Sequence, residues 1–156
     1  MSEKTKNIIK IVVYSILIIL VAAFGSVNSK DYYNSLNLPK GAPPSFVFPV
    51  AWGILYTLII ISASIIELKA KEGIAKKDAL SFYFTQLMVN AVWPYLFFVF
   101  KVPLFSFVWL ILLLVVVVIT FLKFLNLNKA SGYLFIPYIL WIIYAGYVNL
   151  GVALLQ

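Results

Sequence analysis

Three tryptophans lie inside long apolar segments of the chain, each close to a proline and to other aromatic or amide side chains: Trp52, Trp93 and Trp141. Lipid-facing surfaces need only aliphatic side chains, so large flat rings beside amides are better suited to line a pocket. An indole offers a flat surface for stacking, and an amide nearby offers one or two directed hydrogen bonds. These residue types therefore predict a site for a flat, apolar small molecule.

The segment around Trp93 carries two amides on the same helical face as its tryptophan. Gln86, Asn90, Trp93 and Phe97 are spaced i, i+4, i+7 and i+11, which places them along one side of a helix. An amide in lipid lacks partners, so this face should point into a helix bundle. Either the amides tie helices together or, with Trp93, they line a ligand site. Pro94 removes a backbone donor and is expected to kink the helix or open its hydrogen-bond ladder.

Two other segments repeat this combination of rings with small or polar residues. Trp141, Ala145 and Asn149 lie at i, i+4 and i+8, and the small Ala145 leaves room beside the indole for a neighbouring helix or for a ligand. Trp141 lies well inside its segment, which argues against a place in the interfacial aromatic belt. Trp52 and Tyr56, at i and i+4, begin another segment, where such a belt is an equally good explanation.

The residue types of conventional catalysis and of metal binding are missing from these segments. The chain has no histidine and no cysteine, and no carboxylate or lysine lies near the middle of any apolar segment. We therefore predict no metal site, no required cofactor and no acid–base catalysis. Photochemistry between a bound ligand and Trp52 or Trp141 is the chemistry that remains. Trp109 has no polar companion on its face and is expected to contact lipid or another helix.

Five apolar runs must position these residues. The chain is 64% hydrophobic and only 11% charged, so lipid is expected to surround most of it. Each run has roughly 20 residues or more, enough to cross a hydrocarbon core of about 30 Å as a helix. We predict an all-α integral membrane protein, a five-transmembrane-helix bundle that forms one domain over residues 1–156. The first run is longer than most signal-peptide cores and is expected to remain as a helix. The predicted helices cover residues 7–27, 46–68, 80–100, 104–125 and 132–155.

The lysines predict how the bundle crosses the membrane. Of the twelve, only Lys30, Lys40 and Lys101 fall on the side opposite the N-terminus. The positive-inside rule then places the N-terminus in the cytoplasm and the C-terminus outside. Because the lysines flank apolar runs and form no basic face, the net charge of +7 does not predict nucleic-acid binding. The loop of residues 28–45 would lie outside, as a lid or as an ordinary linker. Its candidate lid residues are Tyr32, Tyr33, Pro39, Pro43 and Pro44.

Three motifs follow one another along the chain. The first begins at Asp31-Tyr32-Tyr33, continues through Pro39 and Pro43-Pro44 and ends at Phe48-Pro49-Val50-Ala51-Trp52-Gly53-Ile54-Leu55-Tyr56. The second is Gln86, Asn90 and Trp93 with Phe97-Phe98, and the third is Pro137-Tyr138 and Trp141 with Ala145 and Asn149. In this order they resemble the tryptophan-rich sensory protein family, also called the translocator protein or peripheral benzodiazepine receptor family. Tyr32 and Gly41 stand where the family pattern has tryptophans, so the lid is less aromatic here.

The resemblance implies a five-helix bundle in a bacterial plasma membrane, often a homodimer. It also implies a pocket beneath the first loop that binds porphyrins such as protoporphyrin IX and haem, and the family is associated with sterols and benzodiazepine-site ligands. On that basis Trp52 and Trp141 would line the pocket, Asn90 and Trp93 would contribute to it, and Ala145 would shape its wall. Three functions follow as hypotheses: a porphyrin receptor or carrier, a light-dependent porphyrin-degrading enzyme, or a regulatory scaffold acting through a dimer or partner.

Overall fold

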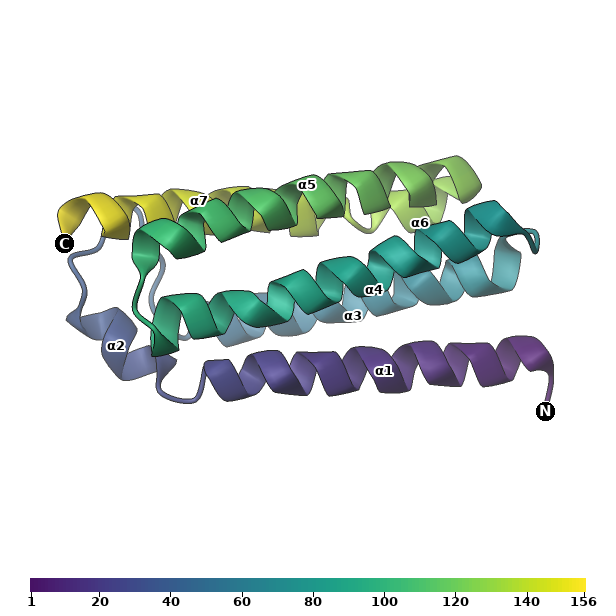
Figure 1. Ribbon diagram of the computed structural model, residues 1–156, viewed down its shortest axis with the longest axis horizontal. Helices are drawn as coiled ribbons and strands as arrows, with labels where there is room; N and C mark the ends of the chain where they lie inside the picture. The colour runs from purple at the N-terminus through teal and green to yellow at the C-terminus, as the bar shows by residue number, and fades with distance from the viewer.

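Five long helices run side by side along the molecule, in agreement with the predicted spans (Figure 1). The computed structural model describes residues 1–156. The five candidate spans are 23 to 27 residues long, enough for a bilayer core of about 30 Å. The elements are α1 (Glu3–Gly25), α2 (Ser29–Ser35), α3 (Val47–Lys69), α4 (Ile74–Pro94), the π-helix η1 (Tyr95–Val99), α5 (Pro103–Leu127), α6 (Lys129–Tyr133) and α7 (Ile136–Leu155).

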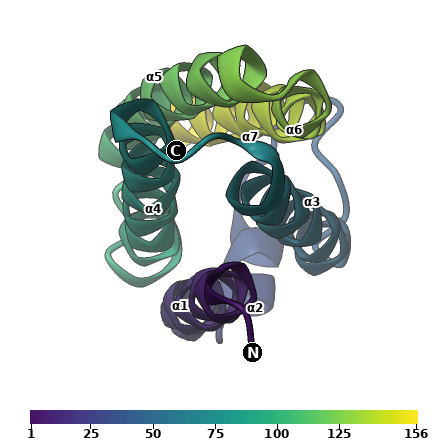
Figure 2. The same ribbon diagram turned by 90° about the vertical axis from the view of Figure 1, so that its right-hand side faces the viewer.

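The long helices form a ring around a shared core. Seen along their axes, the order is α1, α4, α5, α7 and α3, and α3 returns to α1 (Figure 2). The helix that carries the amides is also the most enclosed: half of the most apolar part of α4 and η1 is buried, against 22% for α1. This difference is expected in lipid, where apolar α1 can face the hydrocarbon but the amides of α4 need protein partners.

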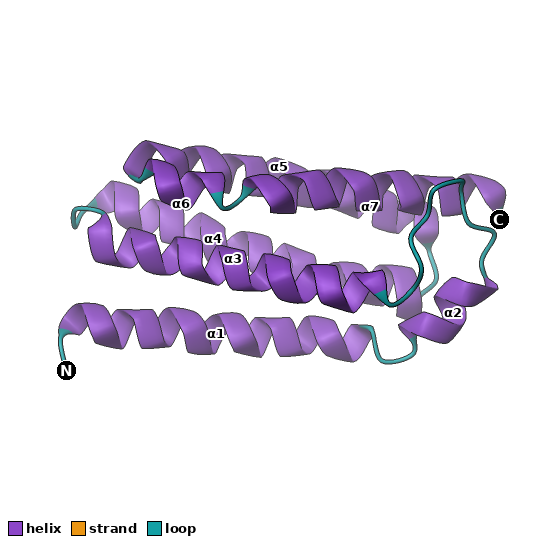
Figure 3. Ribbon diagram, turned by 180° about the vertical axis from the view of Figure 1, so that it is seen from behind, coloured by secondary structure: helices purple, strands orange, loops and turns teal.

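Short helices and breaks distinguish the observed elements from the predicted ones. The predicted loop of residues 28–45 contains α2, and only residues 36–46 form an extended connection, which passes the C-terminal end of α7 (Figure 3). The last span is interrupted at Leu134–Phe135, and Pro137 then occupies the first turn of α7, where its missing N–H has no cost. We call the end of the bundle that carries α2 and the C-terminus the α2 end.

The third span begins at Ile74, six residues before the predicted start, because its charged first turns find partners. The Lys76 ammonium lies 2.8 Å from the Glu67 carboxylate, and each side chain is only 3% exposed. Asn7 of α1 donates to the same carboxylate at 3.0 Å, and Asp78 pairs with Lys123 of α5. Pairing lowers the cost of burying these charges, so α4 extends past them. The same contacts join α4 to α1 and α3 at the end of the bundle opposite the α2 end.

Pro94 changes the type of helix, as its position predicts. The α-helical hydrogen bonding of α4 ends at this residue, and the next five residues form η1. The wider turn closes with a bond from the Phe100 N–H to the Tyr95 carbonyl, at 2.8 Å. Such π-turns often occur at functional sites. Here the turn carries Phe97, which is buried behind Trp93, and Phe98, which lines a cavity.

Candidate ligand-binding cavity

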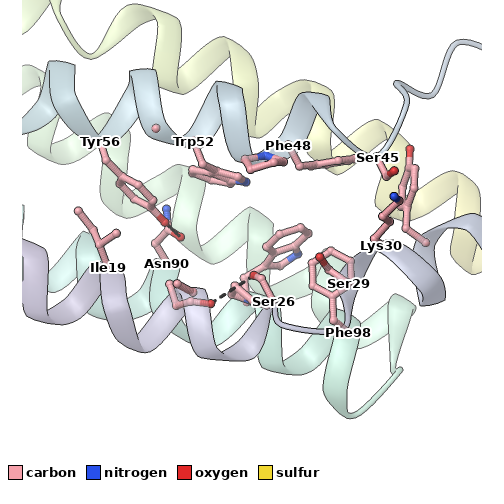
Figure 4. A pocket seen from close by; sticks show the side chains of 17 residues that line it. Ile19, Ser26, Ser29, Lys30, Ser45, Phe48, Trp52, Tyr56, Asn90 and Phe98 are labelled. Atoms are coloured by element: carbon pink, nitrogen blue, oxygen red, sulfur yellow. Dashed lines mark hydrogen bonds between the residues drawn. The ribbon is translucent and has the colours of Figure 1, made fainter.

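A cavity of about 450 Å³ lies between α1, α2, α3 and α4 toward the α2 end of the bundle. Its size is within the range of about 300–1,000 Å³ that is usual for small-molecule sites. In Figure 4, Phe48, Trp52 and Tyr56 follow one another along α3, and Lys30, Ser29 and Ser45 lie near the outer limit of the cavity. The aromatic lining consists of Tyr33, Phe48, Trp52, Tyr56, Trp93 and Phe98.

Trp52 is the centre of an aromatic cluster that forms the cavity wall. Its ring stacks on Tyr56 with a centroid separation of 5.4 Å, and it lies 6.3 Å from Trp93. Trp93 in turn stacks on Phe97 at 5.5 Å with an interplanar angle of only 16°. Each ring that faces the cavity is thus held by a second ring behind or beside it. A wall of this kind offers fixed flat surfaces to a ligand.

The hydrogen bonds of the amides run between helices. Tyr56 on α3 donates to the Asn90 side-chain oxygen at 3.1 Å, and the Asn90 amide donates to the Tyr138 hydroxyl on α7 at 2.6 Å. Tyr138 donates onward to the Gln86 oxygen at 2.8 Å. Asn90 lines the cavity, whereas Gln86 and Tyr138 do not. Gln86 therefore ties helices together, and Asn90 does so while forming part of the cavity surface; that this face binds a ligand stays a prediction.

Asn149 performs a similar task on the far side of Trp93. Its side-chain oxygen accepts from the Trp93 indole at 3.0 Å and from the Ser106 hydroxyl at 3.1 Å, while its amide donates to the Pro103 carbonyl at 2.6 Å. Every hydrogen-bonding atom of the Asn149 side chain is thus engaged by α4 or α5. Since the Trp93 N–H is also engaged, Trp93 presents only its ring to the cavity.

Trp141 lies one layer behind the cavity wall. Its ring packs edge-on against Trp52, with centroids 6.4 Å apart, and against Phe48 at 5.9 Å. Its indole nitrogen is buried and has no hydrogen-bond partner. Ala145, like Trp141, belongs to α7, which contributes no residue to the cavity lining. The structure therefore brings Trp52 and Trp93 together at the cavity and places Trp141 behind Trp52.

The loop of residues 36–46 is fastened to α7. Tyr144 donates to the Gly41 carbonyl at 2.8 Å, and Tyr147 donates to the Lys40 carbonyl at 2.7 Å. Tyr33 of α2 donates to the Pro43 carbonyl at 2.8 Å. Burial, with a smaller contribution from Tyr144, raises the pKa of Tyr33 to about 12, so this donor stays protonated at neutral pH. Of the candidate lid residues, Tyr33 lines the cavity; Tyr32, Pro39, Pro43 and Pro44 do not.

Sequence reasoning missed the contribution of α1. Ile19, Ala22 and Ala23 of α1 line the cavity together with Ser26, the residue that caps this helix. Small residues spaced four apart, such as Ala22 and Ser26, indicate by themselves only close helix packing. Phe48 and Phe98 also line it; they belong to the first and second motifs but were not named as site residues. Trp109 contacts another helix, as expected: its indole donates to the Val89 carbonyl of α4 at 2.8 Å.

Comparison with known proteins links this arrangement to one family. A model of the TspO/MBR family matches residues 10–155. Protein CrtK of Rhodobacter capsulatus is 34% identical over 141 residues, covering 90% of this chain and 88% of that protein. Tryptophan-rich protein TspO of Archaeoglobus fulgidus is 30% identical over 155 residues, covering 96% and 99%. The translocator protein of Ovis aries is 29% identical over 120 residues, covering 76% and 70%.

Proposed function

The chain belongs to the TspO/MBR family and is a multi-pass membrane protein, and from this premise we propose that it is a receptor or carrier that binds a porphyrin, such as protoporphyrin IX or haem, in the cavity beneath α2. The observation that carries the proposal is the wall formed by Trp52, Tyr56 and Trp93, three rings held rigidly around one cavity. A flat conjugated ligand gains dispersion and stacking energy from such a wall.

The distribution of polar groups supports a ligand with one polar edge. Most of the cavity is lined by carbon, and several of its polar residues lie toward its two limits. Asn90 forms the inner limit, and Ser29, Lys30 and Ser45 lie at the α2 end (Figure 4). A porphyrin has an apolar body and two acidic side chains on one edge. Its body would meet the aromatic rings, and its acidic edge would meet the α2 end.

A light-dependent, porphyrin-degrading activity is the second candidate. Its support is the close succession of indoles: Trp52 lies 6.3 Å from Trp93 and 6.4 Å from Trp141, centroid to centroid. The activity requires that illumination yields new absorbing products that depend on Trp52 or Trp141. Identical products from free porphyrin, at the same rate, would exclude it. A homodimer, and a regulatory role through it, remain hypotheses that cross-linking in native membranes would test.

A titration with protoporphyrin IX in the dark, in a nonionic detergent, tests the main proposal. We expect saturable binding, followed by the porphyrin absorption band, and a loss of affinity of roughly two- to tenfold in Trp52→Phe. Trp109→Phe is the matched control, since this indole lies outside the cavity. Asn90→Ala, which alters the inner limit, should also weaken binding. Absence of saturable binding, or equal affinity in Trp52→Phe, Asn90→Ala and wild type, would contradict the proposal.

A further inference from the structure

A second cavity, of about 520 Å³, lies beside the first at the α2 end. It is bounded by the C-terminal end of α1, by α2, by η1 and by Lys101 in the following turn. The short helix α2 separates the two spaces: Ser29, Lys30 and Tyr33 line the first cavity, and Asp31, Tyr32 and Ser35 line the second. Phe98 lines both. A ligand in the first cavity is therefore one aromatic ring away from the second.

Lys101 adopts a backbone conformation that does not suit a lysine. Its φ of 56° makes it the one non-glycine residue of the chain in the left-handed region. For a residue with a Cβ this conformation is unfavourable, whereas glycine or asparagine tolerates it more easily. A turn that needs only this conformation has better residues available. The presence of lysine at this position therefore points to a use for its side chain.

The Lys101 ammonium is also free of a carboxylate partner. It lies over the Tyr32 ring, 5.0 Å from the centroid, and takes part in none of the four ion pairs of the chain. Only Lys30 and Lys40 accompany it at the α2 end, among twelve lysines. Lys30 lines the first cavity and Lys101 lines the second, so one cation borders each space.

We propose that the second cavity binds a carboxylate of an amphiphilic ligand whose apolar body occupies the first cavity, with Lys101 as the recognising cation. The proposal rests on the proposed function, which places a flat ligand in the first cavity. It names the ligand class as a flat diacid with both carboxylates on one edge. One carboxylate meets Lys30 on one side of α2, and the other passes Phe98 to reach Lys101.

Asp31 allows an experiment to determine the charge of the group that enters the second cavity. Its carboxylate lines the same cavity as Lys101. If the cavity receives an anion, Asp31 repels it, and Asp31→Asn should strengthen binding of an acid. If the cavity instead receives a cationic group, Asp31→Asn should weaken binding. The two kinds of ligand thus predict opposite effects of one substitution.

The test compares protoporphyrin IX with its dimethyl ester, which keeps the flat body but has no carboxylates. We expect Lys101→Asn to weaken binding of the acid by about fivefold, the upper range for a partly exposed ion pair, and to leave ester binding unchanged. Asparagine suits the left-handed conformation, so the thermal stability of this variant should not fall. Lys40→Gln is the control, because Lys40 belongs to the same end but lines neither cavity. Added salt should reduce the difference between acid and ester in wild type.

The outcomes separate the two proposals. If acid and ester bind but Lys101→Asn changes neither, or if Asp31→Asn weakens acid binding, the role of Lys101 is overturned while the porphyrin site stands. If neither acid nor ester binds to wild type, the proposed function fails, and the role of Lys101 fails with it. A loss confined to the acid in Lys101→Asn, with Lys40→Gln unchanged and acid binding strengthened in Asp31→Asn, supports the proposal.

Discussion

The attachment of the loop of residues 36–46 to α7 depends on one glycine. Gly151 faces Pro39, and a Cβ added to it would lie 2.4 Å from the proline Cγ and 2.5 Å from its Cβ. Such carbon atoms normally stay at least about 3.5 Å apart. Because both atoms belong to a rigid ring, Gly151→Ala should force the loop away from α7 by about 1 Å.

Gly146 of the same helix supplies a matched control. A Cβ added there meets only Phe107, at an ordinary contact distance of 3.9 Å. The two alanine substitutions gain similar helix propensity, up to about 1 kcal/mol each. The difference between the variants therefore isolates the contact with Pro39.

The hydrogen bonds of the loop determine how much stability Gly151→Ala should lose. Displacement would stretch the bonds from Tyr144 to Gly41 and from Tyr147 to Lys40, each with a net value of about 0.5–1.5 kcal/mol. Gly151→Ala should thus be about 1–3 kcal/mol less stable than Gly146→Ala in thermal or denaturant unfolding. Amide exchange of residues 37–46 should be faster in Gly151→Ala alone. Equal stability and equal exchange in the two variants would show that the loop does not rest on α7 as described.

Two further predictions concern the two ends of the bundle. Since the pKa of Tyr33 is raised to about 12, its bond to Pro43 should contribute fully to stability below pH 10 and be lost as the pH rises through 12. The tyrosinate difference spectrum between wild type and Tyr33→Phe should therefore show a group that titrates well above pH 10. A midpoint near 10 would contradict the burial of Tyr33. At the other end, Lys76→Met should lower the free energy of unfolding by about 3–5 kcal/mol, because Glu67 is left buried without its cation. Adding Glu67→Leu should restore most of this loss. A double variant as unstable as the single one in denaturant unfolding would refute this explanation.

Properties that follow from lipid as a solvent could be predicted from the sequence. The five spans follow from length and hydropathy, and the inward direction of Gln86, Asn90 and Asn149 follows from the cost of an unpaired amide in hydrocarbon. The change of helix type at Pro94 follows from its missing N–H. These constraints act on each helix by itself and need no knowledge of its neighbours.

Which residues meet the cavity could not be predicted in the same way. A helical face points inward, but the neighbouring helices decide whether it meets a cavity or another side chain. The sequence favours Trp141 over Trp52 as a pocket residue, because Trp52 lies where an interfacial belt explains it equally well. In the structure Trp52 lines the cavity and Trp141 packs behind it. Ala22 and Ala23 border the cavity because their side chains are small, and a small side chain leaves no signal for a ligand. The helix α2 was also missed, since seven residues give too short a pattern.

The hydrogen bonding of the wall has a consequence for selectivity. The Trp93 N–H is engaged by Asn149, and Asn90 is engaged by Tyr56 and Tyr138, so the inner cavity offers ring faces and few free donors. A ligand gains there mainly by stacking and by exclusion of lipid or water, which depend on shape and respond little to polar substituents. If the cavity binds flat ligands as proposed, discrimination between them should then arise at the α2 end, where Lys30 and Lys101 lie. For this reason the comparison of acid and ester should reveal more about the physiological ligand than the affinity of any single flat compound.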